Sequence, residues 1–317
     1  MKTKHMITVV TFNPSIDRLY KVENFEIGSV QRAHFVNPTA GGKGINVAKV
    51  LKKLGQDINC VGFLGGFNGD YIKSKIESLG IKDNFTKIEE ETRLCINIID
   101  RNNVSTEVLE NGPYINQNEI MEFENNLFNI LENTKVLVAS GSLAKGIPKD
   151  YYYKLGNLCN EKNIKFILDS SGESLKFGLK AKPYLIKPNV EELENLSGKK
   201  IRNIDDVIDI AKDILNTGVK NVCVSLGKDG MILINSNIIY KVEIPIIEVV
   251  NTVGSGDSSI AGFSLGILNE HNLIDTLKLA NACGMSNAMS ISTGDINLDD
   301  VNKFIDNIEV YEYVYKS

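Results

Sequence analysis

Short apolar runs alternate with stretches of helical periodicity along most of the chain, and this alternation limits the fold more than any other feature of the sequence. In the second half, runs typical of buried strands cover residues 136–139, 166–168, 184–186 and 222–225. Earlier strand candidates cover 7–12 and 58–64, and helices are predicted over 45–54, 70–79 and 119–131. Because neighbouring parallel strands need a long crossover, usually a helix, the pattern predicts an α/β fold of parallel βαβ units. Helices are expected on both faces of the sheet.

Two regions depart from this rhythm. Antiparallel strands are predicted over 231–235, 238–242 and 246–250, before helices over 258–268, 273–288 and 299–308. Short extended segments are predicted over 20–25, 33–38, 94–100 and 105–109. These segments indicate a small β excursion, roughly residues 18–38 and 94–110, which suits a lid over a site. No Pro-, Gly- or Ser-rich linker divides the chain, so a single domain over residues 1–317 is expected.

Charge and cysteine usage argue against several classes of protein. The formal net charge of -5 gives no electrostatic footprint for nucleic acid or an anionic membrane, so neither is expected as a partner. The 5 cysteines form no CxxC pair, and 3 histidines leave little material for a metal centre. No run approaches about 18 apolar residues, and no signal-peptide cleavage site follows residues 2–12, so a cytoplasmic protein is expected. Met6 is a second candidate start, because the first strand begins there.

The most informative string is Asn251-Thr-Val-Gly-Ser-Gly-Asp257, which joins a predicted strand to an apolar helix. Glycines let backbone N–H groups converge, and a helix N-terminus adds roughly half a positive charge. Such a turn can hold the charge that develops on a transferring phosphoryl group, and Asp257 could take a proton from a hydroxyl nucleophile. On spacing alone, Asp257 could equally serve only the helix dipole. The string is neither a Walker loop nor a GxGxxG fingerprint.

A second glycine-rich string, Ala40-Gly41-Gly42-Lys43-Gly44-Ile45-Asn46, also leads directly into a predicted helix. Its glycines permit close approach of a ligand, and Lys43 offers a point charge for a phosphate. Asn46, one turn inside the helix, could bond the hydroxyl groups of a sugar. The alternative is a flexible loop with an incidental lysine.

Shorter elements accompany the two strings. Asp17 follows the first predicted strand, where a carboxylate suits contact with vicinal hydroxyls, or only caps a turn. Arg93 starts an extended segment and could clamp a phosphate through its planar fork, although an isolated arginine is more often solvated. Asn189-x-x-Glu192 opens a helix, and taken alone it is best explained as a capping box.

Together these strings resemble the PfkB/ribokinase family of carbohydrate kinases, from about Met6 to the C-terminus. Residues 41–46 are similar to the first family signature, residues 251–257 to the second, and Asn189-x-x-Glu192 to its N-x-x-E element. Asn251 departs from the aspartate that usually opens the second signature, and Ser255 replaces the usual alanine. The resemblance implies a ribokinase-like three-layer α/β/α fold, with a mostly parallel central sheet and a small β-sheet lid.

The resemblance also implies in-line transfer of the ATP γ-phosphoryl group to a sugar hydroxyl, with Mg²⁺ bridging the phosphates. Catalysis is then expected from Asp257 as general base and from the turn Gly254, Ser255 and Gly256. The sugar and its phosphate would contact Asp17, Gly41, Gly42, Lys43, Asn46, Arg93, Arg32 and Ser142. The nucleotide would contact Lys187, Asn189, Ser225, Gly227, Gly230 and Asn281. Glu192 would hold Mg²⁺ through water.

Within the family, Thr11-Phe-Asn-Pro-Ser-Ile-Asp17 and Ser140-Gly-Ser-Leu143 resemble the branch that acts on phosphorylated ketohexoses. The expected substrate is tagatose 6-phosphate, and the alternatives are fructose 1-phosphate and fructose 6-phosphate. A kinase for unphosphorylated sugars or nucleosides fits Lys43 and Arg93 less well. A non-catalytic sugar-phosphate sensor would not need the intact Gly-Ser-Gly-Asp string, and a dinucleotide-dependent oxidoreductase would need a fingerprint that is missing. A homodimer through the lid is a further implication of the resemblance.

Overall fold

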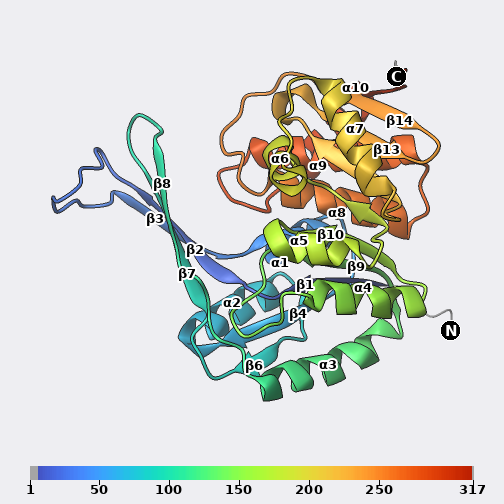
Figure 1. Ribbon diagram of the computed structural model, residues 1–317. Helices are drawn as coiled ribbons and strands as arrows, with labels where there is room; N and C mark the ends of the chain where they lie inside the picture. The colour runs from blue at the N-terminus through green and yellow to red at the C-terminus, as the bar shows by residue number, and fades with distance from the viewer. Residues whose placement is uncertain (1–5, 316–317) are drawn as a thin grey trace.

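A large sheet runs through the body of the protein, and helices cover both of its faces (Figure 1). The computed structural model describes residues 6–315, and within them this sheet has 11 strands in the order β15-β14-β13-β12-β11-β10-β9-β1-β4-β5, with β6 also paired to β4. The strands from β12 to β5 in this order pair in parallel, whereas β13, β14 and β15 are antiparallel. Their bounds are β1 (Met6–Thr11), β4 (Ile58–Gly65), β5 (Lys82–Asp83), β6 (Thr86–Ile88), β9 (Thr134–Ser140), β10 (Lys165–Asp169), β11 (Leu185–Ile186), β12 (Asn221–Ser225), β13 (Met231–Asn235), β14 (Ile239–Glu243) and β15 (Glu309–Glu312).

Alternating side chains of the central strands feed two hydrophobic clusters, one on each face of the sheet. Ile7 and Val9 of β1 join one cluster, and Val10 joins the other, because successive strand residues point to opposite faces. The first cluster includes α1 (Lys43–Lys53), α2 (Gly66–Ser78), α8 (Ser255–Leu268), α9 (Leu273–Ala288) and α10 (Leu298–Asn307). The second includes α3 (Gln117–Leu131), α4 (Tyr151–Glu161), α5 (Gly172–Leu179), α6 (Val190–Ser197) and α7 (Ile204–Leu215).

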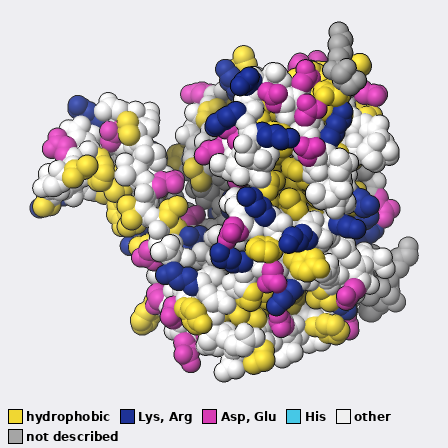
Figure 2. Space-filling model, in the orientation of Figure 1, with side chains coloured by type: hydrophobic (Ala, Val, Ile, Leu, Met, Phe, Trp, Pro, Cys, Tyr) yellow, Lys and Arg dark blue, Asp and Glu magenta, His cyan; other side chains and the backbone are white. Residues whose placement is uncertain are grey.

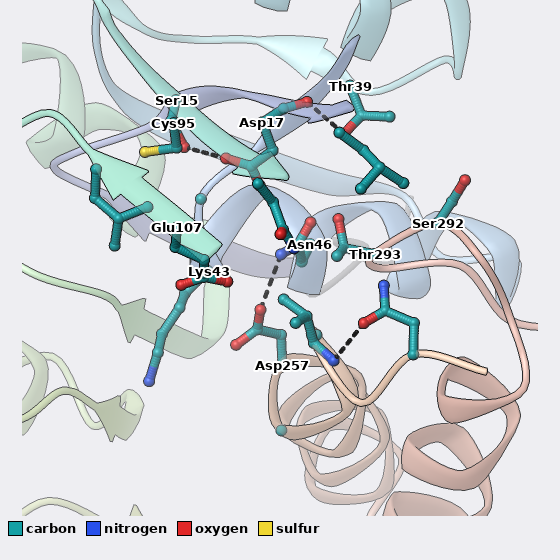
Figure 3. A pocket seen from close by; sticks show the side chains of 18 of the residues that line it. Ser15, Asp17, Thr39, Lys43, Asn46, Cys95, Glu107, Asp257, Ser292 and Thr293 are labelled. Atoms are coloured by element: carbon teal, nitrogen blue, oxygen red, sulfur yellow. Dashed lines mark hydrogen bonds between the residues drawn. The ribbon is translucent and has the colours of Figure 1, made fainter. Parts of the chain in front are cut away.

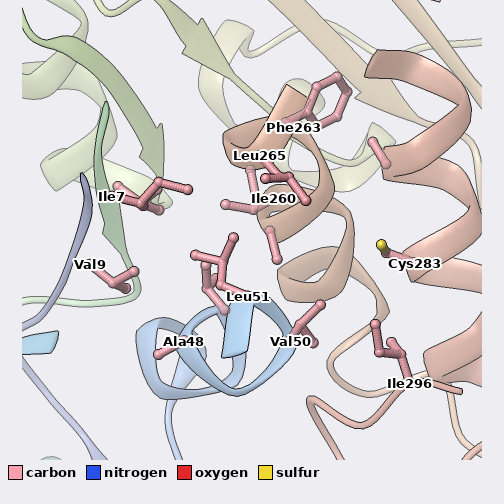
Figure 4. Close-up of a cluster of buried hydrophobic side chains, with 14 of the residues drawn as sticks. Ile7, Val9, Ala48, Val50, Leu51, Ile260, Phe263, Leu265, Cys283 and Ile296 are labelled. Carbon is pink, nitrogen blue, oxygen red and sulfur yellow. The ribbon is translucent and has the colours of Figure 1, made fainter. Parts of the chain in front are cut away.

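Helices α1 and α8 pack side by side on the same face of the sheet, and this packing sets the position of their N-termini. Val50 and Leu51 of α1 lie near Ile260 of α8 in the close-up of the core (Figure 4). All three side chains are fully buried, so truncating any of them to alanine is expected to cost about 2–5 kcal/mol. The core therefore fixes the two helix starts that follow the glycine-rich strings.

A second sheet projects from the body as a lid (Figure 1). Its order is β3-β2-β7-β8, with β2 (Ser15–Lys21), β3 (Phe35–Gly41), β7 (Arg93–Ile99) and β8 (Ser105–Leu109). β2 pairs antiparallel with β3 and parallel with β7. The sheet begins at Ser15 and extends to Gly41, beyond the predicted limits of residues 18 and 38. Asp17 in β2 and the start of the first glycine-rich string, Ala40 and Gly41 at the end of β3, therefore lie in the lid strands where these meet the body.

The strand predicted over 246–250 is wrong. Ile246, Val249 and Val250 are exposed, and the N–H groups of Val250 and Asn251 both donate to the carbonyl oxygen of Ala288, at 2.8 and 3.0 Å. The edge of β14 is instead covered by β15 from the C-terminal region. The strands predicted over 20–25 and 33–38 are also displaced, because the lid pairing starts and ends nearer the body. Within residues 6–315, no helix is long and apolar enough to cross a membrane.

Candidate active site

A cavity of about 460 Å³ lies between the lid sheet and the carboxyl ends of the parallel strands. This edge is where open α/β sheets bind their ligands. From the lid strands it is lined by Asp17, Thr39, Arg93 and Glu107, and from the body by Lys43, Asn46, Asp169, Lys187, Asn189, Glu192, Ser225, Gly254, Gly256 and Asp257. Figure 3 shows side chains from both parts facing one another across the cavity. The lid and the body thus enclose a single candidate site.

The two glycine-rich strings meet in this cavity. The side-chain amide of Asn46, in the first turns of α1, donates to Asp257 Oδ2 over 2.9 Å (Figure 3). Both side chains are buried, and they are joined although 211 positions separate them in the sequence. The opposite oxygen, Asn46 Oδ1, is buried and has no protein partner. An unpaired acceptor beside a carboxylate is what a hydroxyl group of a ligand could satisfy.

Asp257 has the electrostatic environment of a general base. Burial raises the pKa of its carboxyl group to about 6, and the charge of Lys43 opposes the rise while that of Asp169 adds to it. Only 6% of the residue is exposed. A carboxyl group with this pKa is ionised at neutral pH and is a stronger base than an ordinary aspartate.

Lys43 extends from the start of α1 between two carboxylates. Its Nζ lies 3.4 Å from Asp169 Oδ2 and 3.8 Å from Glu192 Oε1. The Asp169 charge raises the pKa of Lys43 despite its burial. Burial opposes ionisation of Asp169, but the charges of Lys43 and Lys187 hold its pKa below the usual range. The site therefore keeps a positive Lys43 beside Asp257 at neutral pH.

Gly41 and Gly42 allow the end of β3 to pass close to Asp17. A Cβ atom at Gly41 would lie 2.0 Å from Asp17 Oδ2, and Gly42 has a φ of 95°, which favours glycine. The hydroxyl of Ser15 donates to Asp17 Oδ1 over 2.6 Å. Burial raises the pKa of Asp17, and the Ser15 hydrogen bond limits the rise. Asp17 thus presents a held carboxyl group on the lid side of the cavity.

The turn before α8 places backbone N–H groups and a lysine together. Gly254, at the N-cap of α8, has a φ of 85°. The first N–H groups of a helix lack intrahelical partners and carry its positive dipole end. A Cβ atom at Gly256 would lie 3.2 Å from Lys187 Nζ, so this ammonium group lies against the turn. The arrangement can stabilise negative charge.

Asn287 organises this turn and is a residue that sequence reasoning missed. Its side chain is fully buried. Its Nδ2 donates to the carbonyl oxygen of Val253 over 2.9 Å and to Ser255 Oγ over 3.2 Å, while its Oδ1 accepts from the Gly294 N–H over 2.8 Å. It therefore ties the turn before α8 to the loop that follows α9. Asn287 lies in a largely apolar helical stretch that contains no motif. The one local sign of its role is that a polar residue stands in this largely apolar stretch.

Arg93 lines the cavity from β7. Its guanidinium donates to the carbonyl oxygens of Asn13 over 3.0 Å and Glu110 over 3.2 Å, and its Nε is buried without a partner. Among the described residues, no carboxylate lies within ion-pair distance of it. Arg93 is thus held by backbone oxygens, and no ion pair with a described carboxylate neutralises its guanidinium.

The capping-box explanation of Asn189 and Glu192 is confirmed: Asn189 Oδ1 accepts from the Glu192 N–H over 2.7 Å, and Glu192 Oε2 accepts from the Asn189 N–H over 3.0 Å. Both residues also line the cavity, as the motif-based prediction requires. Among the described residues, no group of three or more potential metal ligands is present. The partly exposed carboxylate of Glu192 could hold Mg²⁺ through water, because Mg²⁺ commonly keeps several waters and binds substrate phosphates.

Some predicted site residues lie outside the cavity lining. Gly41 packs against the side chain of Asp17, and Ser255 Oγ accepts a hydrogen bond from Asn287 Nδ2. Ser142 Oγ accepts from Asn13 Nδ2 over 3.2 Å, and Asn281, buried inside α9, donates to the Leu277 carbonyl oxygen over 2.8 Å. Arg32 lies in an exposed loop of the lid. Gly227 and Gly230 lie in the turn after β12. None of these residues lines the cavity within the described chain.

Comparison with known proteins places the chain among sugar kinases. Residues 6–300 match the pfkB family of carbohydrate kinases. Tagatose-6-phosphate kinase of Staphylococcus epidermidis is 43% identical over 310 residues, which cover 97% of this chain and 100% of the relative. Phosphofructokinase-2 of Escherichia coli, solved with substrates and products, is 26% identical with a TM-score of 0.90, covering 96% of this chain and 99% of the other. Its tetrameric inhibited form gives a TM-score of 0.87 at 26% identity and the same coverage.

Proposed function

Since the chain belongs to the pfkB family of carbohydrate kinases, we propose that it transfers the γ-phosphoryl group of ATP to a hydroxyl group of a ketohexose monophosphate. The observation that carries this proposal is the contact between Asn46 and Asp257 at 2.9 Å, inside a cavity that also contains Lys43. It brings a base, an acceptor for a hydroxyl group and a cation to one place. This combination is what phosphoryl transfer to an alcohol needs.

In the proposed reaction, Asp257 accepts the proton of the sugar hydroxyl as its oxygen attacks the γ-phosphorus. The bond between that phosphorus and the β,γ-bridging oxygen breaks, and ADP leaves. The turn at Gly254 and Gly256, with the N-terminus of α8, stabilises the negative charge of the transferred group. Proton abstraction by a positioned base contributes about 10²–10⁴ in rate, and one anion-stabilising donor about 10²–10³.

We assign each of two cationic side chains, Lys43 and Arg93, to a different phosphate group. Lys43 lies between Asp169 and Glu192, so we assign to it the phosphoryl group in transfer, in place of the sugar phosphate expected from the sequence. Arg93, on the lid side and without a carboxylate partner among the described residues, is assigned to the phosphate that the sugar already carries. Bound Mg²⁺ would neutralise the ATP phosphates, with Glu192 as its water-bridged protein partner. Lys187, Asn189 and Ser225 also line the cavity, and we assign them to the nucleotide.

Tagatose 6-phosphate is the proposed acceptor, with tagatose 1,6-bisphosphate as the product. The 43% identity with a tagatose-6-phosphate kinase over its full length supports this choice. Fructose 6-phosphate and fructose 1-phosphate are the alternatives, because the fold is also that of phosphofructokinase-2. The test is kcat/KM for the three sugar phosphates side by side, with ATP and Mg²⁺. ADP release with none of them would leave a non-catalytic sensor as the explanation.

The assignment of Arg93 has its own test. Arg93→Ala is expected to raise KM for the phosphorylated sugar by at least about tenfold, since it removes a charge-assisted pair. The same substitution should change KM for unphosphorylated tagatose or fructose little. Equal changes in KM for the phosphorylated and free sugars would show that Arg93 does not bind the phosphate.

We also propose that the lid joins two copies of the chain. Hydrophobic side chains gather along the projecting lid (Figure 2), and Ile27, Val30, Val108 and Leu109 are each more than half exposed. Exposed hydrophobic side chains that gather on one surface favour association. Sedimentation of the native chain and of Val108→Lys tests it, since a charge on this face should shift the chain toward a monomer. We further propose a cytoplasmic location, which the five free and buried cysteines support because a reducing compartment keeps thiols free.

A further inference from the structure

A second cavity, of about 530 Å³, adjoins the candidate active site and is lined by residues of α1 and α2. Its walls carry four lysines, Lys49, Lys52 and Lys53 from α1 and Lys75 from α2. Among the described lining residues, Asp295 is the only carboxylate. We refer to this cavity as the lysine pocket. Its positive charge contrasts with the formal net charge of -5 for the whole chain.

The ammonium groups of the lysine pocket are incompletely neutralised by the protein. Lys53 pairs with Asp295, and Lys52 has a partly exposed partner, Asp57, at 3.5 Å. Lys75 lies over the ring of Tyr71, with 5.3 Å from Nζ to the ring centroid, and has no carboxylate within ion-pair distance among the described residues. Like charges gathered in one concavity attract an anion and raise its local concentration.

Lys49 is the deepest of these lysines, and its bonds are to neutral groups. Its Nζ donates to the carbonyl oxygens of Ala40 and Thr293. Burial lowers the pKa of Lys49, and the charges of Asp17 and Asp295 counteract this effect. An anion in the pocket would therefore meet one partly buried ammonium group, that of Lys49, and those of three further lysines, in a volume that suits a small ligand.

We propose that the lysine pocket binds a small phosphate-bearing anion, and that this binding acts on the active site. The pocket and the active-site cavity share Thr39 and Ser292 in their walls. Lys49 and Lys53 hold the loop after α9, through the carbonyl oxygens of Thr293 and Ile296. Thr293 lines the active site, so an anion that draws either ammonium group toward itself also moves a wall of that site.

Inorganic phosphate is the probe for binding. In a titration followed by the ¹H–¹⁵N spectrum of the whole chain, the amides of Ser78 and Leu79 report the lysine pocket, and those of Gly254 and Gly256 report the active site. Phosphate is expected to shift both groups of signals with separate midpoints. The midpoint at Ser78 should rise with NaCl, since screening over about 10 Å at 0.1 M weakens the attraction.

The double variant Lys52→Gln/Lys75→Gln tests the location, because both residues lie outside the active-site cavity. It should raise the phosphate midpoint at Ser78 by at least about tenfold, while the Gly254 amide should still respond to phosphate that binds in the active site itself. Lys73→Gln is the matched control on the same helix, since Lys73 pairs with Asp83 at 2.7 Å away from the pocket. Absence of a shift at Ser78 in the native chain, or an unchanged midpoint in the double variant, would overturn the proposal.

Steady-state kinetics distinguish coupling between the lysine pocket and the active site from direct competition of phosphate with the substrates. Phosphate can compete in the active site of both proteins, but only the native chain should show an additional change in KM for ATP, of at least about twofold. The same phosphate dependence in the native chain and in Lys52→Gln/Lys75→Gln would overturn the coupling. A chain without any kinase activity would refute the proposed function, while the spectral titration would still decide whether the pocket binds phosphate.

Discussion

Replacing Asp257 by asparagine should make the protein more stable while removing its base. Burial raises the pKa of Asp257 from an ordinary value of 3.8 to about 6, so holding it ionised in the folded chain costs about 3 kcal/mol at pH 7.5. Asparagine has the same shape and can still accept the hydrogen bond from Asn46. The substitution should therefore raise the free energy of unfolding by up to about 3 kcal/mol at pH 7.5.

The pH dependence of this gain follows from the direction of the shift. Between pH 3.8 and about 6 the folded carboxyl group is protonated while the unfolded one is ionised, so the stability of the native chain falls as pH rises through this window. The advantage of Asp257→Asn should be largest above pH 6 and should vanish below about pH 4. Urea unfolding of both proteins at pH 7.5 and pH 5 measures it.

Asp169 is the matched control, because the neighbouring cations lower its pKa instead of raising it. Its ionised form contributes stability at neutral pH, which is lost as pH falls through its depressed pKa. Asp169→Asn should therefore destabilise the chain at pH 7.5, the opposite of Asp257→Asn. If both substitutions destabilised the chain equally, the electrostatic description of this site would be refuted.

Three further predictions concern the geometry of the site. The kcat/KM should fall about tenfold per pH unit below about pH 6, because this ratio reports the free enzyme, and the break should be absent from any residual activity of Asp257→Asn; the same break in both would assign it to another group. Gly41→Ala should raise KM for the sugar at least about tenfold, because its Cβ would meet Asp17 Oδ2 at 2.0 Å; an unchanged KM would remove Asp17 from sugar binding. Asn287→Asp should lower kcat/KM at least about tenfold, because a carboxylate cannot donate to Val253 and repels a phosphate nearby; activity equal to the native enzyme would show that this tie is dispensable.

Local patterns in the sequence predicted most of the body of the fold. The helix over 45–54 and the strand over 58–64 match α1 and β4 within two residues at each end, because apolar periodicity there agrees with burial. The segment 246–250 has the apolar, β-branched composition of a strand, yet at its end the N–H groups of Val250 and Asn251 both donate to the carbonyl oxygen of Ala288, the last residue of α9. No local pattern reveals that competition, since it depends on a partner distant in the sequence.

The residues of the candidate site likewise include some that local sequence patterns predicted and some that depend on contacts between distant segments. Asp257, Lys43 and Asn46 could be predicted because each belongs to a string whose glycines and helix start are visible locally. Asn287 and Lys49 were missed because their roles arise from bonds to Val253 and Thr293, which only the packing of α1, α8 and α9 brings within reach. The nucleotide assignment of Asn281 rested on resemblance alone, and that side chain is bonded inside its own helix.

The proton-accepting role of Asp257 is tested most directly by the turnover of Asp257→Asn with tagatose 6-phosphate and ATP, measured beside the affinity of the same variant for MgATP. We expect a fall in kcat of at least about 10²-fold, with MgATP affinity close to that of the native chain. Turnover at nearly the native rate would contradict it.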